Sequence, residues 1–366
     1  MFNFYSKISF LNALIILLLI ASLSGCKDLI TNNVKTTENK MYVYPNKGNT
    51  FYLVDYKTYE VVREIKLNVP HNTYLFGMIL STNRDHLIFS AHDTTTHREG
   101  FLTYDITNDK MDNIYITDLI NIGPERFISG QNRFLQGLVY VYYPDLGIYL
   151  LDVFERKVVK LISSENGFNI DKDLFHSPDG KWDVIRKSFG AQAYSEIEVY
   201  TANTDFTDLQ FVLNQNNKDS IDVYYSGIAF SLDNGLFISY QPSGGKYNTA
   251  GYIGVYDLNT RQLTRTSLKF PWSLNGYYIA YNSSRNELYD VGNKGIFYII
   301  DTDTYTIKKT INLSVQGQES PIVLSPDKNT AFVAFSDNDK LFVIDLSSGQ
   351  IIKTISLNHP YKILIP

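Results

Sequence analysis

Two histidines and an aspartate form the closest group of side chains that could bind a metal ion. His92, Asp93 and His97 lie together in the segment HDTTTHREG. Zinc and related ions take imidazole nitrogens and carboxylate oxygens as ligands, and a structural zinc site needs four of them. The chain has six His and one Cys, and no second cluster accompanies this pair. The sequence therefore favours no metal site here, and we expect no bound cofactor.

The sequence also lacks the common motifs of hydrolysis and nucleotide chemistry. It contains no Gly-x-Ser-x-Gly, no P-loop and no His-Glu-x-x-His. One Cys cannot form an intrachain disulfide or a thiolate zinc cluster. The net charge of −5 argues against nucleic acid as a partner. We therefore expect a binding or scaffold protein rather than an enzyme.

The composition favours strands as the elements that position these side chains. The chain has 28 Tyr and 22 Phe, which suit strands, and its 44% hydrophobic and 19% charged residues exclude a disordered chain. From Met41 onward a short apolar strand recurs every 44 to 56 residues. These strands end at Asp55, Asp105, Asp152, Thr201, Asp257, Asp301 and Asp345.

Each repeat contains four short strands, which is typical of a β-propeller blade. The pattern predicts an all-β fold of seven blades, each with four antiparallel strands, over residues 41–366. We interpret the recurrent Asp as a turn device, because its carboxylate can accept hydrogen bonds from backbone N–H groups of the next turn. Most of the Tyr and Phe side chains should pack between blades.

Three segments resemble the YVTN repeat: MYVYPNKGNTFYLVDYKTYEVVREI, ELYDVGNKGIFYIIDTDTYTIKKTI and TAFVAFSDNDKLFVIDLSSGQIIKTI. The resemblance is good in blades 1, 3, 6 and 7 and weaker in the other three. It implies a seven-bladed propeller that is usually non-catalytic. Two other kinds of propeller are catalytic. Quinone-cofactor dehydrogenases need repeated Trp motifs, which two Trp cannot supply, and a lactonase-like hydrolase stays a second alternative, although no acid–His–Arg group can be placed.

The repeat region starts with an incomplete blade and ends with an extra strand. Residue 41 enters blade 1 at its second strand, whereas blade 7 is complete by Leu357 and is followed by the apolar segment 361–365. The sequence therefore predicts that residues 361–365 supply the missing strand of blade 1 and close the ring. Closing a ring removes exposed sheet edges that would invite aggregation.

A ligand site is predicted on the connections between second and third strands, which are long in blades 2, 4 and 5. These connections read HDTTTHREG, KSFGAQAYSE and QPSGGKYNTAG, and the segment KFPWSLNG between blades is expected on the same face. Aromatic, basic and amide groups there suit a sugar or a tetrapyrrole-like ring, although plain surface variation would give the same pattern. The candidate residues are His92, His97, Arg98, Phe189, Tyr194, Lys246, Tyr247 and Trp272.

The N-terminus predicts a membrane anchor. Residues 1–25 have a basic start and a short apolar run, as in a secretory signal peptide. Residues 23–26, LSGC, resemble the bacterial lipobox, which implies lipidation of Cys26. Lys27 follows it, which by resemblance to enterobacterial sorting rules implies the outer membrane. Residues 26–40 then form a flexible tether.

These observations together predict a lipid-anchored, non-catalytic binding or scaffold propeller in the bacterial cell envelope. Its partner would be a small molecule or a protein. Some YVTN-like surface lipoproteins are similar in layout and bind cobalamin. The alternative prediction is therefore a surface protein that captures a cobalamin-like or sugar ligand for a TonB-dependent transporter.

Overall fold

The computed structural model describes most of the repeat region. The described residues are 38–45, 48–81, 84–95, 98–114, 127–131, 138–143, 147–154, 157–162, 170–176, 182–189, 194–201, 223–231, 235–242, 251–260, 262–270, 278–292, 294–317 and 320–366. Asn39–Pro366 form one compact unit, described here by itself. Among the described residues the regular elements are strands apart from one 3-10 turn, η2 (Ser336–Asn338), and none is a helix that could cross a membrane. The predicted anchor at Cys26 lies outside the described residues.

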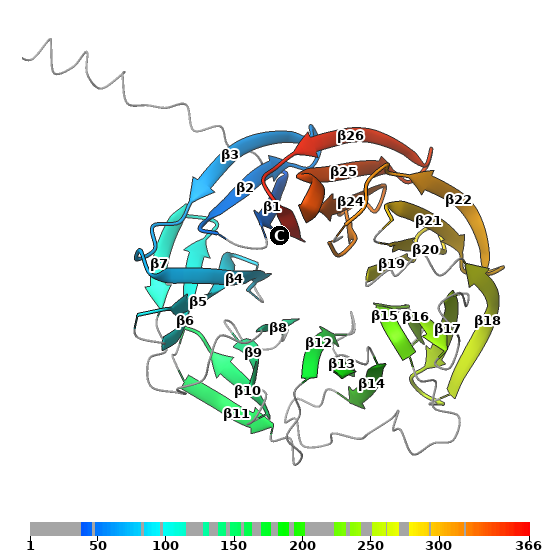
Figure 1. Ribbon diagram of the computed structural model, residues 1–366, viewed down its shortest axis with the longest axis horizontal. Helices are drawn as coiled ribbons and strands as arrows, with labels where there is room; N and C mark the ends of the chain where they lie inside the picture. Colours follow the sequence, from blue (N-terminus) through cyan, green and yellow to red (C-terminus); the bar gives the residue numbers. More distant parts are fainter. Residues whose placement is uncertain are drawn as a thin grey trace, which may run out of the picture. The chain divides into compact units, whose positions relative to one another are not determined.

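Five sheets have four antiparallel strands each, and within four of them the strand order follows the chain (Figure 1). The sheet that contains both ends of the compact unit has β27 (Pro360–Leu364), β1 (Lys40–Pro45), β2 (Thr50–Asp55) and β3 (Glu60–Lys66). The next has β4 (Thr73–Leu80), β5 (His86–Asp93), β6 (Arg98–Asp105) and β7 (Lys110–Ile114). A third has β8 (Phe127–Gln131), β9 (Leu138–Tyr143), β10 (Gly147–Asp152) and β11 (Lys157–Ile162).

Two further four-stranded sheets lie at the C-terminal side of the chain. One has β19 (Tyr278–Asn282), β20 (Glu287–Val291), β21 (Ile296–Asp301) and β22 (Thr306–Asn312). The other has β23 (Val323–Leu324), β24 (Thr330–Phe335), β25 (Lys340–Asp345) and β26 (Gln350–Ser356). The first strand of this last sheet is only two residues long.

The remaining strands form one sheet of seven, where the sequence predicts two separate blades. Its strands are β12 (Ile170–His176), β13 (Trp182–Phe189), β14 (Tyr194–Thr201), β15 (Val223–Phe230), β16 (Gly235–Pro242), β17 (Gly251–Asp257) and β18 (Gln262–Phe270). Only two residue pairs join β14 to β15. This narrow junction joins the three strands β12 to β14 to the four strands β15 to β18, because β14 would otherwise be an edge strand with unpaired backbone groups. The segment 202–222 between them lies outside the described residues.

The C-terminal strand pairs with the first strand of the compact unit, as the sequence predicts. Tyr42 lies opposite Leu364 and Val43 lies opposite Ile363 in an antiparallel ladder. Ile363 is buried in a cluster that also holds Met41 of β1 and Phe332 of β24. Strand β27, near the end of the chain, therefore completes the sheet that contains β1, the first strand of the compact unit.

The cores lie between neighbouring sheets and are rich in aromatic side chains. Tyr42, Phe51, Phe89 and Tyr104 form one such core between the sheets of β1 and β5. Similar cores pack β20 against β24 and β16 against β20. In the second and third strands β20, β21, β24 and β25 both faces are largely buried, whereas the fourth strands β22 and β26 are largely exposed. The described part of the chain thus confirms that Tyr and Phe pack between sheets.

Removing residues 359–366 should destabilise the protein severely. The deletion exposes the edge of β1 and removes Ile363, which is 2% exposed. Loss of one buried Ile side chain alone costs about 2–5 kcal/mol. Thermal unfolding measures the effect, and removal of Pro366 alone, which lies beyond β27, is the matched control. A melting temperature within about 3 °C of the parent would show that the pairing carries little stability.

Candidate functional site

The four-stranded sheets have two different edges. We call the "turn edge" the side where third strands turn into fourth strands, at 55–60, 105–110, 301–306 and 345–350. We call the "loop edge" the side where second strands connect to third strands, at 46–49, 94–97, 292–295 and 336–339. Ion pairs and hydrogen bonds join the turn edges of neighbouring sheets, as Lys57 Nζ and Asp327 Oδ2 do at 2.6 Å. The turn edges of neighbouring sheets therefore form one surface, which can be compared with the surface formed at the loop edge.

A recurrent aspartate holds each turn of the turn edge. The Oδ1 atom of Asp55 accepts hydrogen bonds from the backbone N–H groups of Lys57 and Thr58, both at 2.8 Å. The same two bonds, at 2.8–3.0 Å, recur at Asp105, Asp257 and Asp301. At Asp345 the bond from Ser348 N is 2.6 Å. These bonds confirm the interpretation of the recurrent aspartate as a turn device.

The turn hydrogen bonds also stabilise the charged form of these carboxylates. The backbone N–H of Asn108 lowers the pKa of Asp105, and that of Thr260 lowers the pKa of Asp257. The N–H of Ser348 lowers the pKa of Asp345 in the same way. A carboxylate that accepts hydrogen bonds is favoured over the neutral acid. These groups are therefore ionised and satisfied at neutral pH.

Four residues after Asp55, Asp105, Asp301 and Asp345, the turn places one residue in the left-handed conformation. The φ angle is +60° at Tyr59, +54° at Asp109, +51° at Tyr305 and +58° at Gly349. These positions contact the neighbouring sheet. The ring of Tyr59 lies 6.4 Å from that of Phe332, and Asp109 Oδ1 accepts a 2.7 Å bond from Arg63 Nη2. Each turn thus joins its own sheet to the next one.

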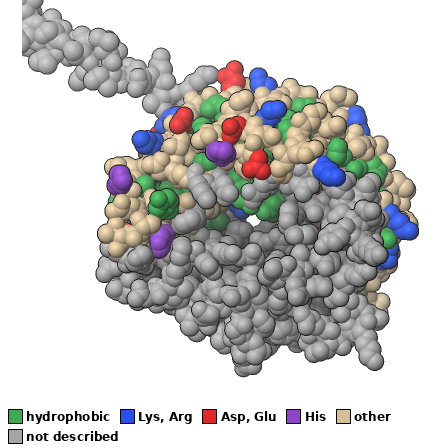
Figure 2. All heavy atoms as spheres, in the orientation of Figure 1, with side chains coloured by type: hydrophobic (Ala, Val, Ile, Leu, Met, Phe, Trp, Pro, Cys, Tyr) green, Lys and Arg blue, Asp and Glu red, His purple; other side chains and the backbone are tan. Residues whose placement is uncertain are grey.

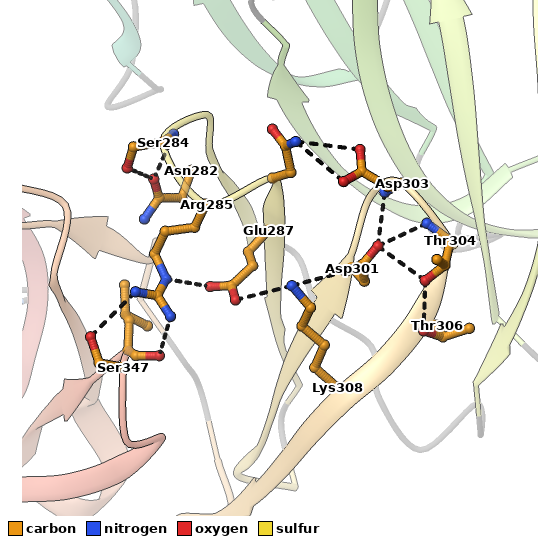
Figure 3. A network of polar contacts seen from close by, with 12 residues as sticks. Asn282, Ser284, Arg285, Glu287, Asp301, Asp303, Thr304, Thr306, Lys308 and Ser347 are labelled. Carbon is orange, nitrogen blue, oxygen red and sulfur yellow. Dashed lines mark hydrogen bonds and ion pairs between the residues drawn. The ribbon is translucent and has the colours of Figure 1, made fainter.

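A polar network around the buried Glu287 extends these links between the last two sheets (Figure 3). Glu287, which is 5% exposed, accepts hydrogen bonds from Arg285 Nε and Tyr289 Oη, both at 2.8 Å. Lys308 Nζ lies 3.4 Å from Glu287 Oε1 and 2.8 Å from Asp301 Oδ2. Arg285 also donates to Ser347 Oγ at 3.2 Å, in the turn of the next sheet. The polar groups of this turn edge bind one another, so they hold the sheets together rather than facing a ligand.

The described candidates for a ligand site lie at the loop edge, but two of its connections are shorter than predicted. Pairing continues to the register Asp93–Arg98, so His92 lies in β5 and is 6% exposed rather than lying in a loop. Similarly, Phe189 lies opposite Tyr194, which leaves only residues 190–193 between the two strands. These polar segments have no apolar pattern typical of strands, but backbone pairing does not require apolar side chains. Between β16 and β17, residues 243–250 remain a longer connection.

The structure brings only some of the predicted site residues together. Phe189, Tyr194 and Tyr224 occupy one line across β13, β14 and β15. His92 and Arg98 lie at the end of another hairpin, in the sheet of β4 to β7. The remaining candidates, His97, Lys246, Tyr247 and Trp272, lie outside the described residues. That these residues bind a ligand stays a prediction.

The loop edge has a further polar group that the sequence reading missed. Tyr278 of β19 and Tyr361 of β27 approach each other with their hydroxyl oxygens 3.2 Å apart. Nearby, His359 N donates to Asp339 Oδ1 at 2.8 Å, and His359 Nδ1 lies 3.0 Å from the carbonyl oxygen of Ser336. Aligning the repeats on their first strands would have found the tyrosines, because Tyr74 and Tyr361 each follow the residue that opens a first strand.

The possible metal ligands and the charged side chains of the described residues are dispersed rather than clustered. No group of three or more His, Cys, Asp or Glu side chains converges among these described residues. Asp93, which the sequence places between the two histidines, accepts a 2.8 Å bond from Thr95 N. Figure 2 shows basic and acidic side chains interspersed on the described part of one face.

Comparisons with known proteins add evidence on the fold. No family model matches the chain, and no curated protein does. Among solved structures, dihydro-heme d1 dehydrogenase NirN in complex with DHE is 14% identical, with a TM-score of 0.58 over 89% of this chain and 75% of NirN. Hydrazine synthase of Kuenenia stuttgartiensis is 13% identical, with a TM-score of 0.59 over 84% of this chain and 93% of that one. AztD from Citrobacter koseri is 13% identical, with a TM-score of 0.50 over 88% and 96%.

NirN and AztD are β-propeller proteins. Identities this low carry information on fold and not on ligand or activity. The four-stranded antiparallel sheets and these likenesses together define the chain as a β-propeller protein.

Substitutions at Asp345 should separate its acceptor role from its charge. Asp345→Ala removes the acceptor of the turn and should cost about 1 kcal/mol at pH 7, as loss of a capping side chain does. Asp345→Asn keeps an amide oxygen that can accept the same bonds and should cost less. Urea unfolding at pH 7 measures both. An Asn variant as unstable as the Ala variant would show that charge, not hydrogen bonding, holds this turn.

The same variants predict how stability depends on pH. The pKa of Asp345 is lowered in the folded state, so its contribution is fully present above the usual aspartate pKa of about 4. That contribution is lost as pH falls through the lowered pKa. The difference in unfolding free energy between the parent and Asp345→Ala should therefore shrink on acidification below about pH 4. A difference that grows in acid would contradict this assignment.

Proposed function

We propose that this chain is a lipid-anchored, non-catalytic binding protein of the bacterial cell envelope, with its ligand held on the loop edge of a seven-bladed propeller. The observation that carries the proposal is the contrast between the two edges. On the turn edge the described carboxylates cap turns or bridge sheets, as Asp55 and Asp109 do. On the loop edge, exposed aromatic and polar side chains such as Tyr74 remain at the ends of strands.

The proposal of seven blades divides the seven-stranded sheet at its two-pair junction between β14 and β15. That division gives one blade of β12 to β14 and one of β15 to β18, beside the five four-stranded sheets. The pairing of β27 with β1 supports a ring in which both ends of the compact unit share one blade. A closed ring couples neighbouring interfaces into a cooperative circle, which suits a rigid binding platform.

The anchor rests on the lipobox-like segment LSGC and its single cysteine, Cys26. Several acyl chains on one cysteine would give stable membrane attachment, where a single chain is marginal. The sorting residue Lys27 favours the outer membrane. A propeller tethered there would present its ligand site within the envelope or at the cell surface.

Replacing Cys26 with Ser should abolish lipidation. The variant should keep its signal segment or appear as a soluble form, because Ser has no thiol to be acylated. Membrane fractionation and mass spectrometry of the N-terminal peptide test this, with Ser24→Ala as a control that keeps the thiol. Unchanged membrane partitioning and mobility of Cys26→Ser would contradict the proposed anchor.

Replacing residues 243–250 with a short turn should weaken ligand binding and leave the fold intact. Surface connections tolerate changes of length, since loop closure costs grow slowly with length. Calorimetric titration with cyanocobalamin and with neutral oligosaccharides measures binding, and thermal unfolding measures the fold. Thr58→Ala, on the exposed part of the turn edge, is the control. Full retention of binding by the loop variant would place the ligand elsewhere on the protein.

A further inference from the structure

Three sheets have a tyrosine among the first two residues of their first strand, at the same edge. We use "first strand" for the strand at the start of a sheet's order, which here means β4, β19 and β27. Tyr74 and Tyr361 are the second residues of β4 and β27, and Tyr278 is the first residue of β19. Tyr74 lies opposite His92 and Tyr278 lies opposite Val291, so both lie where second strands end. All three tyrosines therefore belong to the loop edge.

The tyrosines come from sheets that lie close together at this edge. Tyr278 and Tyr361 touch through hydroxyl oxygens 3.2 Å apart, although the sheet of β23 to β26 separates their strands in the chain. β4 also contacts β27, which brings the strand of Tyr74 to the same edge. Phenol groups from three sheets thus lie at the loop edge.

The exposure of these side chains argues against a purely structural role. Tyr74 is 58% exposed, whereas the next residue, Leu75, is 2% exposed and packs in a core between sheets. Tyr278 and Tyr361 are partly exposed.

The chemistry of the three side chains selects a class of ligand. A phenol combines an apolar ring face with a hydroxyl that both donates and accepts hydrogen bonds. None of the three carries charge at neutral pH, so nothing in the group selects an anion or a cation. A sugar ring has the complementary surface, with an apolar C–H face and hydroxyl groups at its rim. Tyrosines also supply binding area at low cost in conformational entropy.

We propose that Tyr74, Tyr278 and Tyr361 form a platform that binds a neutral carbohydrate chain. This proposal rests on the proposed binding function and names its ligand class. The pair of Tyr278 and Tyr361 supplies hydroxyls at a fixed spacing. Tyr74 supplies an open ring face on which a sugar can stack. A free oligosaccharide and a segment of a polysaccharide share this chemistry, so both are sources that the test must distinguish.

The test uses the full chain in detergent against an array of neutral glycans, followed by calorimetry with maltohexaose, cellohexaose and chitohexaose. The parent should bind at least one of these probes saturably. Tyr74→Ala should weaken that binding by about tenfold or more, because it removes the stacking face. Tyr278→Phe and Tyr361→Phe should each weaken it by about threefold to tenfold, because each removes one hydroxyl. A matching long polysaccharide that binds more tightly than its hexamer would identify an extended chain as the source.

Two controls separate recognition from structure. Tyr56→Phe removes a phenol hydroxyl at the turn edge and should leave affinity unchanged. Melting temperatures of the platform variants should stay near that of the parent. A purely structural role would instead lower the melting temperature without a matching loss of affinity per folded molecule. Absence of saturable binding to every neutral glycan overturns the carbohydrate proposal.

The outcomes also distinguish this proposal from the more general one. Binding of cyanocobalamin, but of no glycan, would uphold a binding propeller and overturn the carbohydrate class. Glycan binding that survives all three tyrosine substitutions, yet is lost on replacing residues 243–250, would uphold a loop-edge site and overturn the platform.

Discussion

The bond from a backbone N–H group to an aspartate Oδ1 is the interaction on which the turn edge of this fold depends. Each turn must reverse the chain within a few residues, which leaves N–H groups without ladder partners. At Asp55, Asp105, Asp257 and Asp301 one carboxylate oxygen satisfies two of them. The reversed chain then places a left-handed residue, such as Tyr59 or Asp109, against the neighbouring sheet. A local hydrogen bond thereby sets contacts between sheets.

This arrangement divides the surfaces of the protein by role. Because Arg285 bonds the turn of the next sheet while Glu287 and Lys308 bond within their own sheet, the turn edge they occupy is part of the scaffold. Asp327 belongs to the same scaffold, since the Lys57 ammonium group lowers its pKa to about 2. The opposite edge also has contacts between sheets, such as that of His359 with Asp339, but its connections differ from sheet to sheet.

The sequence predicts those features that repeat and misses those that depend on a single departure from the repeat. The recurrent Asp, the aromatic cores and the pairing of residues 361–365 with β1 all follow from periodicity and phase. The lengths of the connections after β5 and β13 do not, because polar segments such as HDTTTHREG pair through their backbones without an apolar pattern. Glu287 was missed because its partners, Arg285 and Lys308, become neighbours only once the hairpins form.

The meeting of Tyr278 and Tyr361 shows how a repeat fold can gather side chains that no single repeat contains. The two tyrosines belong to sheets that are separated in the chain by the sheet of β23 to β26, yet their hydroxyl oxygens lie 3.2 Å apart at the loop edge. In a fold of similar sheets, such a place combines a rigid frame with a local composition of its own, which is what selective binding requires.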